Sequence, residues 1–155
     1  MPDGSLDFSP EVLSGLDFVI GSIHSSFRMP REEMTGRICK ALANPHMHIL
    51  GHPTGRLLLE REAYALDLDQ VIAAAARHGK SIEINCHPQR LDLESPYARR
   101  AAGLGVGLVI SPDAHWTGDF AHISLGVTTA RRGWLTKKDV INTLPWKQAL
   151  AALNR

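Results

Sequence analysis

The chain has 155 residues, of which 44% are hydrophobic and 21% are charged, and its formal net charge is +1. This length and composition fit one globular domain with a buried core and exclude wholesale disorder. No apolar run approaches the roughly 18 residues of a membrane-spanning helix, and the N-terminus lacks the features of a signal or transit peptide. The two cysteines, Cys39 and Cys86, do not suggest a disulfide framework, so we predict a protein of the reducing cytoplasm with no membrane partner.

Short apolar runs alternate with helical patterns along the chain. In chain order, the pattern predicts a strand at 18–23, a helix at 30–43, a strand at 48–51, a helix at 68–77, a strand at 81–85, a helix from 95 to about 103, a strand at 106–110, a weaker strand at 123–127, and helices from 136 and from 145. Strands that alternate with helices are typical of an α/β protein with a largely parallel sheet. There is no linker or repeat, so residues 1–155 are predicted to form one unit.

Residues at the helix ends support these assignments. Pro30 stands in the first turn of the first helix. Asp67 can accept a hydrogen bond from the first turn of the second helix, and Gly79 follows its last turn. The segment from Thr136 to Asp139 resembles a capping box with aspartate in the position of glutamate, and it predicts a short helix.

Four successive predicted strands are each followed by polar side chains. These are His24 after the first strand, His52 after the second, Asn85 and His87 after the third, and Asp113 and His115 after the fourth. The intervals of 28, 33 and 28 residues between 24, 52, 85 and 113 each fit one strand–helix–strand crossover. Because the carboxyl ends of parallel strands lie at one edge of the sheet, we expect these side chains to form one cluster.

Imidazole nitrogens and carboxylate oxygens are ligands for Zn²⁺, Mn²⁺ or Fe²⁺. Such an ion can lower the pKa of a bound water toward ~7 and can neutralise the oxygens of a phosphate. The cluster therefore predicts metal-dependent hydrolysis of a phosphoester. A single histidine after a strand is more often an ordinary polar residue, so the prediction depends on the agreement of all four strand ends.

Further residues are candidates for contact with the substrate. Arg56, at the end of a glycine-containing segment, can form a forked contact with a phosphate, or it can be a surface residue of a tight turn. Asn85 and His87 are predicted to line the site. Trp116 can stack on a base or cap the site. Residues 95–155 carry a net charge of +5, which suits a phosphorylated ligand, although ordinary surface charge explains it equally well.

The candidate ligands lie within a series of short motifs along the chain, at residues 2–7 (PDGSLD), 20–25 (IGSIHS), 49–56 (ILGHPTGR), 83–85 (EIN), 88–93 (PQRLDL), 111–115 (SPDAH) and 130–135 (ARRGWL). These motifs resemble the polymerase-and-histidinol-phosphatase (PHP) superfamily, and most closely the C-terminal PHP domain of bacterial and archaeal family X DNA polymerases. The segment 142–145 (NTLP), which follows the last of these, also matches. The resemblance covers nearly the whole chain.

The resemblance implies the C-terminal part of a distorted seven-stranded, TIM-like barrel that holds up to three divalent ions, Mn²⁺ or Zn²⁺. His24 and His52 would ligate one ion, Asp113 another and His115 a third, with Asp113 and His115 as catalytic residues. The implied activity is removal of nucleotides from DNA 3′ ends by a 3′–5′ exonuclease in DNA repair.

The chain departs from the family in lacking the His-x-His motif near the first strand, a further upstream histidine, an aspartate and a bridging glutamate. We therefore expect only the later part of the domain here, and an isolated chain short of metal ligands. Its expected partners are a DNA 3′ end or another phosphoester, and either the missing barrel segment or a second copy. The alternatives are a small-molecule phosphatase of the histidinol-phosphatase type, or a degenerate, non-catalytic or oligomeric module.

Overall fold

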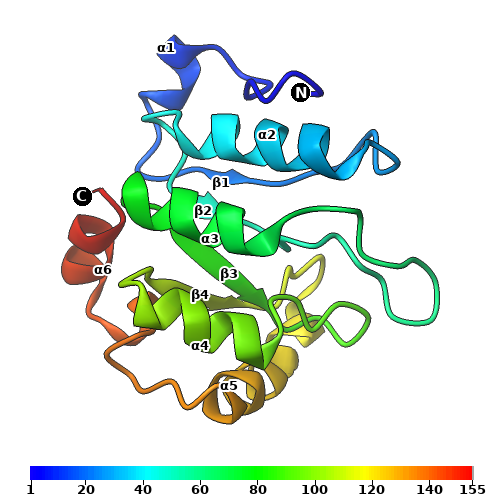
Figure 1. Ribbon diagram of the computed structural model, residues 1–155. Helices are drawn as coiled ribbons and strands as arrows, with labels where there is room; N and C mark the ends of the chain where they lie inside the picture. Colours follow the sequence, from blue (N-terminus) through cyan, green and yellow to red (C-terminus); the bar gives the residue numbers. More distant parts are fainter. Residues whose placement is uncertain (155) are drawn as a thin grey trace.

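Four short parallel strands lie side by side in their order along the chain (Figure 1). They are β1 (Ile20–Gly21), β2 (Ile49–Leu50), β3 (Ser81–Asn85) and β4 (Leu108–Ser111). In the computed structural model, which describes residues 1–154, Ile49 pairs with both Ile20 and Ser81, and Ile82 pairs with Leu108. The predicted α/β class and parallel sheet are thus confirmed. The described residues form an open sheet, and the seven-stranded barrel stays a prediction.

Six α-helices and two 3₁₀ helices connect and cover the strands in the described part of the chain. The α-helices are α1 (Pro10–Leu13), α2 (Arg31–Leu42), α3 (Leu68–Arg77), α4 (Ser95–Gly103), α5 (Ile123–Arg132) and α6 (Trp146–Leu153), and the 3₁₀ helices are η1 (Thr117–His122) and η2 (Ile141–Thr143). Helices α2, α3 and α4 lie next to one another along one face of the sheet (Figure 1). As predicted, Asp67 caps α3 by accepting a hydrogen bond from Gln70 N at 3.0 Å.

The strand predicted at 123–127 is wrong, because this run is the first half of α5. Its buried positions, Gly126 and Ala130, are four residues apart, which is the spacing of one helix face. A side chain at Gly126 would clash with Ile110 and Cys86, since its Cβ would lie 2.5 Å from an Ile110 carbon. The helix therefore packs closely on β4, and an apolar window of five residues does not reveal this contact.

The predicted helix at 136 is also replaced by another structure. The expected capping contact forms, because Asp139 Oδ2 accepts hydrogen bonds from Thr136 N at 2.7 Å and from its hydroxyl at 2.9 Å. However, Val140 is extended and forms a parallel bridge with Leu108, which ends the turn before η2. The helices α1 and η1 were not predicted.

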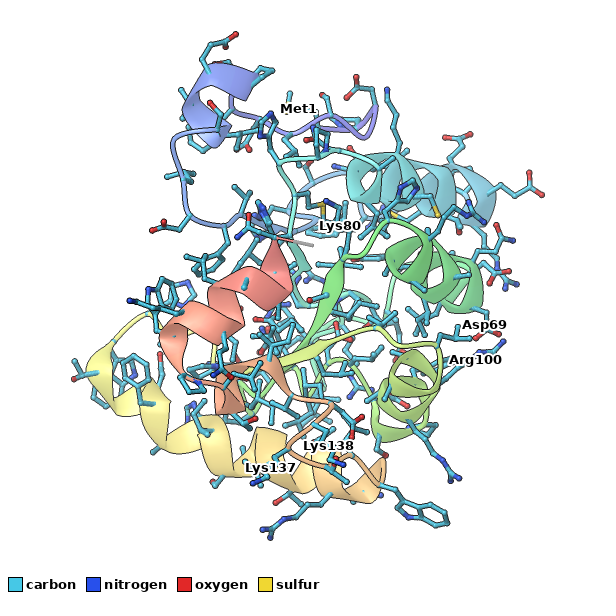
Figure 2. All side chains as sticks on the ribbon, turned by 90° about the vertical axis from the view of Figure 1, so that its left-hand side faces the viewer. Met1, Asp69, Lys80, Arg100, Lys137 and Lys138 are labelled. Atoms are coloured by element: carbon cyan, nitrogen blue, oxygen red, sulfur yellow. The ribbon has the colours of Figure 1, made fainter. Side chains whose placement is uncertain are left out.

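The two faces of the sheet are covered differently. Alternate strand residues, such as Ile82 and Ile84, join the main apolar core with residues of α2, α3 and α4. On the opposite face a smaller apolar cluster lies under α6, and it includes Ile49, Ala149 and Leu153. Figure 2, which looks from the left-hand side of Figure 1, shows α6 in front of the strands.

Contacts between neighbouring helices complete the packing. Arg100 of α4 pairs with Asp69 of α3, with Nε and Oδ1 3.0 Å apart (Figure 2). Both side chains are about half exposed, so this pair contributes at most about 1 kcal/mol. Among residues 1–154, each helix is too short or too polar to cross a bilayer.

Candidate active site

Two predicted metal ligands meet beyond the carboxyl ends of β1 and β2. His24 is exposed and His52 is buried, and their Nε2 atoms lie 3.2 Å apart. Two nitrogen ligands on a tetrahedral zinc ion, each about 2.05 Å from the metal, lie about 3.3 Å apart, so this spacing fits a shared ion. Burial and the nearby Arg90 lower the pKa of His52 to about 4. The ring is therefore neutral at pH 7, as a ligand must be.

Buried Glu83 on β3 connects this pair to the rest of the site. Its Oε2 accepts a hydrogen bond from His52 N at 2.6 Å and another from Asn85 Nδ2 at 3.2 Å. Gly51, directly before His52, makes room for Ser22, because a Cβ there would lie 2.6 Å from Ser22 Oγ. Burial raises the pKa of Glu83 to about 7.

Asp113, after β4, is held by two partners on the same oxygen. Asn85 Nδ2 donates to Asp113 Oδ2 at 3.1 Å, and Arg90 Nε lies 3.2 Å from that oxygen. Asn85 is fully buried, and its own Oδ1 accepts a hydrogen bond from His87 N at 3.0 Å. Within residues 1–154, Asp113 Oδ1 makes no such contact and can accept a ligand.

The predicted phosphate-binding residue Arg56 contacts the backbone of the loop that carries Arg90. Its guanidinium donates to the Arg90 carbonyl at 2.8 Å, to the Leu91 carbonyl and to the carboxylate of Glu94. The backbone N–H groups of Thr54 and Gly55 donate to buried Asp92 Oδ2 at 2.9 and 3.1 Å. Arg56 therefore fixes the loop that carries Arg90, and its contact with a phosphate stays a prediction.

His115, the fourth predicted metal ligand, lies apart from the His24–His52 pair. His115 is exposed, and its Nδ1 lies 2.7 Å from the Asp113 carbonyl. The predicted ligands His24, His52, Asp113 and His115 are not gathered within coordinating distance of one ion. Among residues 1–154, the one group of three or more possible ligands with atoms within 4.8 Å of one another is His87, Asp119 and His122.

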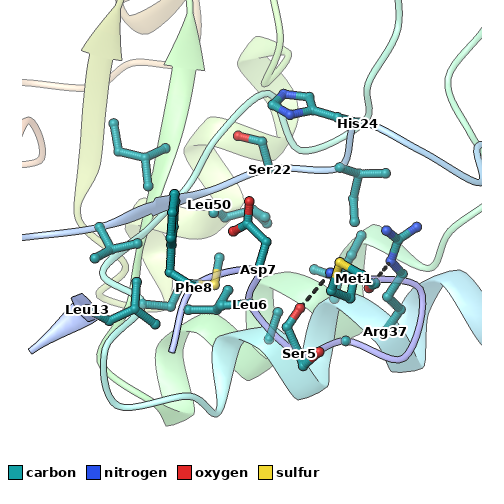
Figure 3. A pocket seen from close by; sticks show the side chains of 18 of the residues that line it. Met1, Ser5, Leu6, Asp7, Phe8, Leu13, Ser22, His24, Arg37 and Leu50 are labelled. Carbon is teal, nitrogen blue, oxygen red and sulfur yellow. Dashed lines mark hydrogen bonds between the residues drawn. The ribbon is translucent and has the colours of Figure 1, made fainter. Parts of the chain in front are cut away.

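A pocket of about 460 Å³ opens beside His24, between the N-terminal segment, β1 and α2. Figure 3 shows the Asp7 carboxylate pointing toward Ser22 and the His24 ring above them. Leu6 and Leu13 supply part of its apolar wall. The pocket thus adjoins one end of the polar network, and a carboxylate and a hydroxyl are among the groups that line it.

Sequence reasoning missed three residues of this arrangement: Glu83, Arg90 and Asp119. Alternation along β3 places Glu83 on the same face as Asn85. A charged residue at this position of an apolar strand indicates a role in the site, so Glu83 was predictable from the sequence. Asp119 is three residues before His122, so both lie on one side of a helical turn. The position of Arg90 depends on the path of a loop and had no such signal.

A scan against protein-family models finds none that matches the chain. The chain is 43% identical to the DNA polymerase/3′-5′ exonuclease PolX of Bacillus subtilis (strain 168) over 155 residues, which cover all of this chain and 27% of PolX. It is 29% identical over 150 residues to a probable phosphatase of Thermoanaerobacter sp. (strain X514), covering 91% of this chain and 59% of that protein. A probable phosphatase of Acetivibrio thermocellus is 34% identical over 119 residues, which cover 72% of this chain and 47% of that protein.

The chain is therefore an α/β protein whose relatives are named as an exonuclease and as probable phosphatases. Within that group it is related over its full length to bacterial PolX, which confirms the predicted resemblance to the PHP superfamily and its family X polymerase branch. The chain spans about a quarter of the length of PolX and 59% of the first of these phosphatases.

Proposed function

We propose that the chain is the phosphoester-hydrolysing part of a divalent-metal-dependent 3′–5′ exonuclease that trims DNA ends during repair in the cytoplasm. The main support for this proposal is the polar network at the carboxyl ends of the strands, which runs from the His24–His52 pair through Glu83 and Asn85 to Asp113. The names of the relatives support this proposal, because exonucleases and phosphatases both hydrolyse phosphoester bonds.

His24 and His52 would hold one ion, and Asp113 and His115 would hold others. Bound there, Mn²⁺ or Zn²⁺ would lower the pKa of a water molecule and neutralise phosphate oxygens. Asn85 and Arg90 orient the Asp113 carboxylate, and Arg90 places a positive charge beside it. The proposal includes a complete barrel, in which an upstream segment or a second copy continues the sheet beyond β1.

Exposed aromatic side chains beside the site favour a nucleic-acid substrate. Trp116, which directly follows His115, is 70% exposed, and Phe120, within the next 3₁₀ helix η1, is 63% exposed. A side chain at Gly118 would collide with the Trp116 ring, since its Cβ would lie 2.2 Å from it, so the ring rests on this glycine. Bases stack on such rings without regard to sequence.

The second candidate function is a small-molecule phosphatase, which the names of several relatives favour.

To distinguish the exonuclease from the phosphatase, hydrolysis of a 5′-labelled oligonucleotide and of a small phosphomonoester is measured with Mn²⁺ and with Zn²⁺. We expect nucleotide release from the 3′ end, with loss of activity in Asp113→Ala and His52→Ala. Activity that survives both substitutions contradicts the proposed site. A folded chain that hydrolyses neither substrate favours the non-catalytic alternative.

A further inference from the structure

We propose that His87, Asp119 and His122 form a zinc-binding site separate from the four ligands His24, His52, Asp113 and His115. It joins the loop after β3 to the 3₁₀ helix η1, which ends at His122. The proposal does not depend on the proposed phosphoesterase activity, because it uses none of the four predicted metal ligands and is tested by metal binding alone.

The spacing of the three side chains suits a metal ion. Each offers one ligand atom, and these atoms lie within 4.8 Å of one another. Ligands on a tetrahedral zinc ion lie about 3.3 Å apart, so the group must contract by at most roughly 1.5 Å, which rotation of side chains can supply. Two imidazoles and a carboxylate are a common zinc ligand set, and they leave the fourth position for water.

Asp119 is held in the orientation that a ligand requires. Its Oδ2 accepts hydrogen bonds from His115 N at 2.8 Å and from Trp116 N at 3.3 Å. The other oxygen, Oδ1, is directed toward His122, with 3.9 Å between Oδ1 and Nδ1. The carboxylate is thus fixed by one oxygen and presents the other.

His122 and His87 supply the two nitrogen atoms. His122 Nδ1 is buried and has no hydrogen-bond partner within residues 1–154, because 3.9 Å from Asp119 is too long for a hydrogen bond. A buried polar atom without a partner is costly, and a metal ion would satisfy it. An ion pair with Asp119 alone would explain His122, but it leaves unexplained why a second imidazole, His87, lies edge-on at 5.6 Å between ring centres.

The cost of binding at His87 is small. Its Nδ1 accepts a long hydrogen bond of 3.3 Å from Gln89 N. An ion bound at Nδ1 would replace that contact, and an ion bound at Nε2 would leave the proton on Nδ1 and break it, so either way one long hydrogen bond is lost. In return, the ion would tie η1 to the loop after β3. Since Asp119 also holds the backbone of His115 and Trp116, the ion would brace the segment that carries them.

The test counts zinc in a chain without the His24–His52 pair. His52→Asn removes that pair, and asparagine tolerates the positive φ of 27° at this position. Zinc affinity is measured by competition with a chromophoric chelator, and zinc content by elemental analysis after desalting. We expect His52→Asn to keep a zinc ion at the proposed site. The added change His122→Asn should weaken its binding by at least about 100-fold, since even the loss of a ligand's outer partner weakens metal binding by roughly 10–100-fold.

Two further variants keep the test decisive. His87→Asn, in a loop, should weaken zinc binding as His122→Asn does, even if the latter disturbs η1. His46→Asn is the matched control, because His46 lies before β2, at the opposite end of that strand from His52, and should leave zinc binding unchanged. Equal zinc affinity in His52→Asn with and without the change at His87 overturns the proposal. Absence of hydrolysis with zinc still bound contradicts only the proposed function.

Discussion

Strand β3 presents Ile82 and Ile84 to one side of the sheet and Glu83 and Asn85 to the other, and all four side chains are at most 4% exposed. On the first side the contacts are apolar and belong to the main core. On the second side, Glu83 and Asn85 are hydrogen-bonded to His52, to Asp113 and to each other. Equal burial therefore serves two purposes, since one face stabilises the fold and the other positions the candidate site.

The two faces also differ in energy. Burial of apolar area is favourable by about 25 cal/mol per Å², whereas burial of a carboxyl group is costly unless its hydrogen bonds are replaced. The raised pKa of Glu83, at about 7, reflects that cost. We therefore expect changes on the polar side to affect activity more than stability, and changes on the apolar side to do the reverse.

The largest effect is expected from His24→Asn at the outer end of the polar network. A metal ion contributes several kcal/mol to the transition state, so loss of a ligand should lower Mn²⁺-dependent hydrolysis by roughly 10²–10³-fold. His24 is exposed, so the free energy of unfolding in urea should change by less than about 0.5 kcal/mol. His78→Asn, at the end of α3, is the control. Full activity in His24→Asn would remove this residue from the site.

The opposite result is expected from Ile84→Ala on the apolar side. Ile84 is fully buried, and its truncation should lower the free energy of unfolding by about 3 kcal/mol through lost transfer energy and a cavity. The activity per folded molecule should stay the same. Urea denaturation and a rate assay at saturating metal measure both quantities. A loss of less than about 1 kcal/mol would show that the two faces do not differ as described.

Trp116→Ala tests whether the polar side extends to a surface for bases. Stacking contributes about 1–3 kcal/mol per base, so the variant should cleave an oligonucleotide about tenfold more slowly. Hydrolysis of a small phosphomonoester should be unchanged, because it has no base to stack. Trp134→Ala is the matched control, since Trp134 is also exposed but packs against Arg99. An equal loss on both substrates would argue against stacking at Trp116.

The sequence predicts the apolar side of the molecule more fully than the polar side. Helix α3 and strand β3 have their predicted bounds, because periodicity and the Asp67 cap are local signals. Alternation along parallel strands likewise places Asn85 and Asp113 at one edge. The joining residue Arg90 was missed, since its place depends on a loop with a positive φ of 45° at Leu91, and no local pattern encodes that path.

The smallest effect, on stability alone, is expected at His48, a buried polar residue that stabilises the fold and, within residues 1–154, has no contact with the candidate site. Its Nδ1 accepts a hydrogen bond from Val19 N at 3.0 Å, and its Nε2 lies 3.1 Å from Asn154 Oδ1. Burial lowers the pKa of His48 below its usual value of 6.5. At a pH between the pKa values of His48 in the folded and unfolded chain, the unfolded chain binds more protons. The contribution of His48 to the free energy of unfolding is therefore fully present above pH 6.5 and decreases as the pH falls below that value.

His48→Asn should therefore lower stability by about 1 kcal/mol at pH 7.5, through the lost contact with Asn154, and should weaken the decline below pH 6.5. Urea denaturation at a series of pH values, with chelator present, measures this. His46→Asn, two residues away, leaves both hydrogen bonds of His48 in place and should keep the stability of the parent chain at pH 7.5. If His48→Asn keeps the decline below pH 6.5, the decline originates in another group, and His48 would no longer be an example of a polar side chain that serves the fold alone.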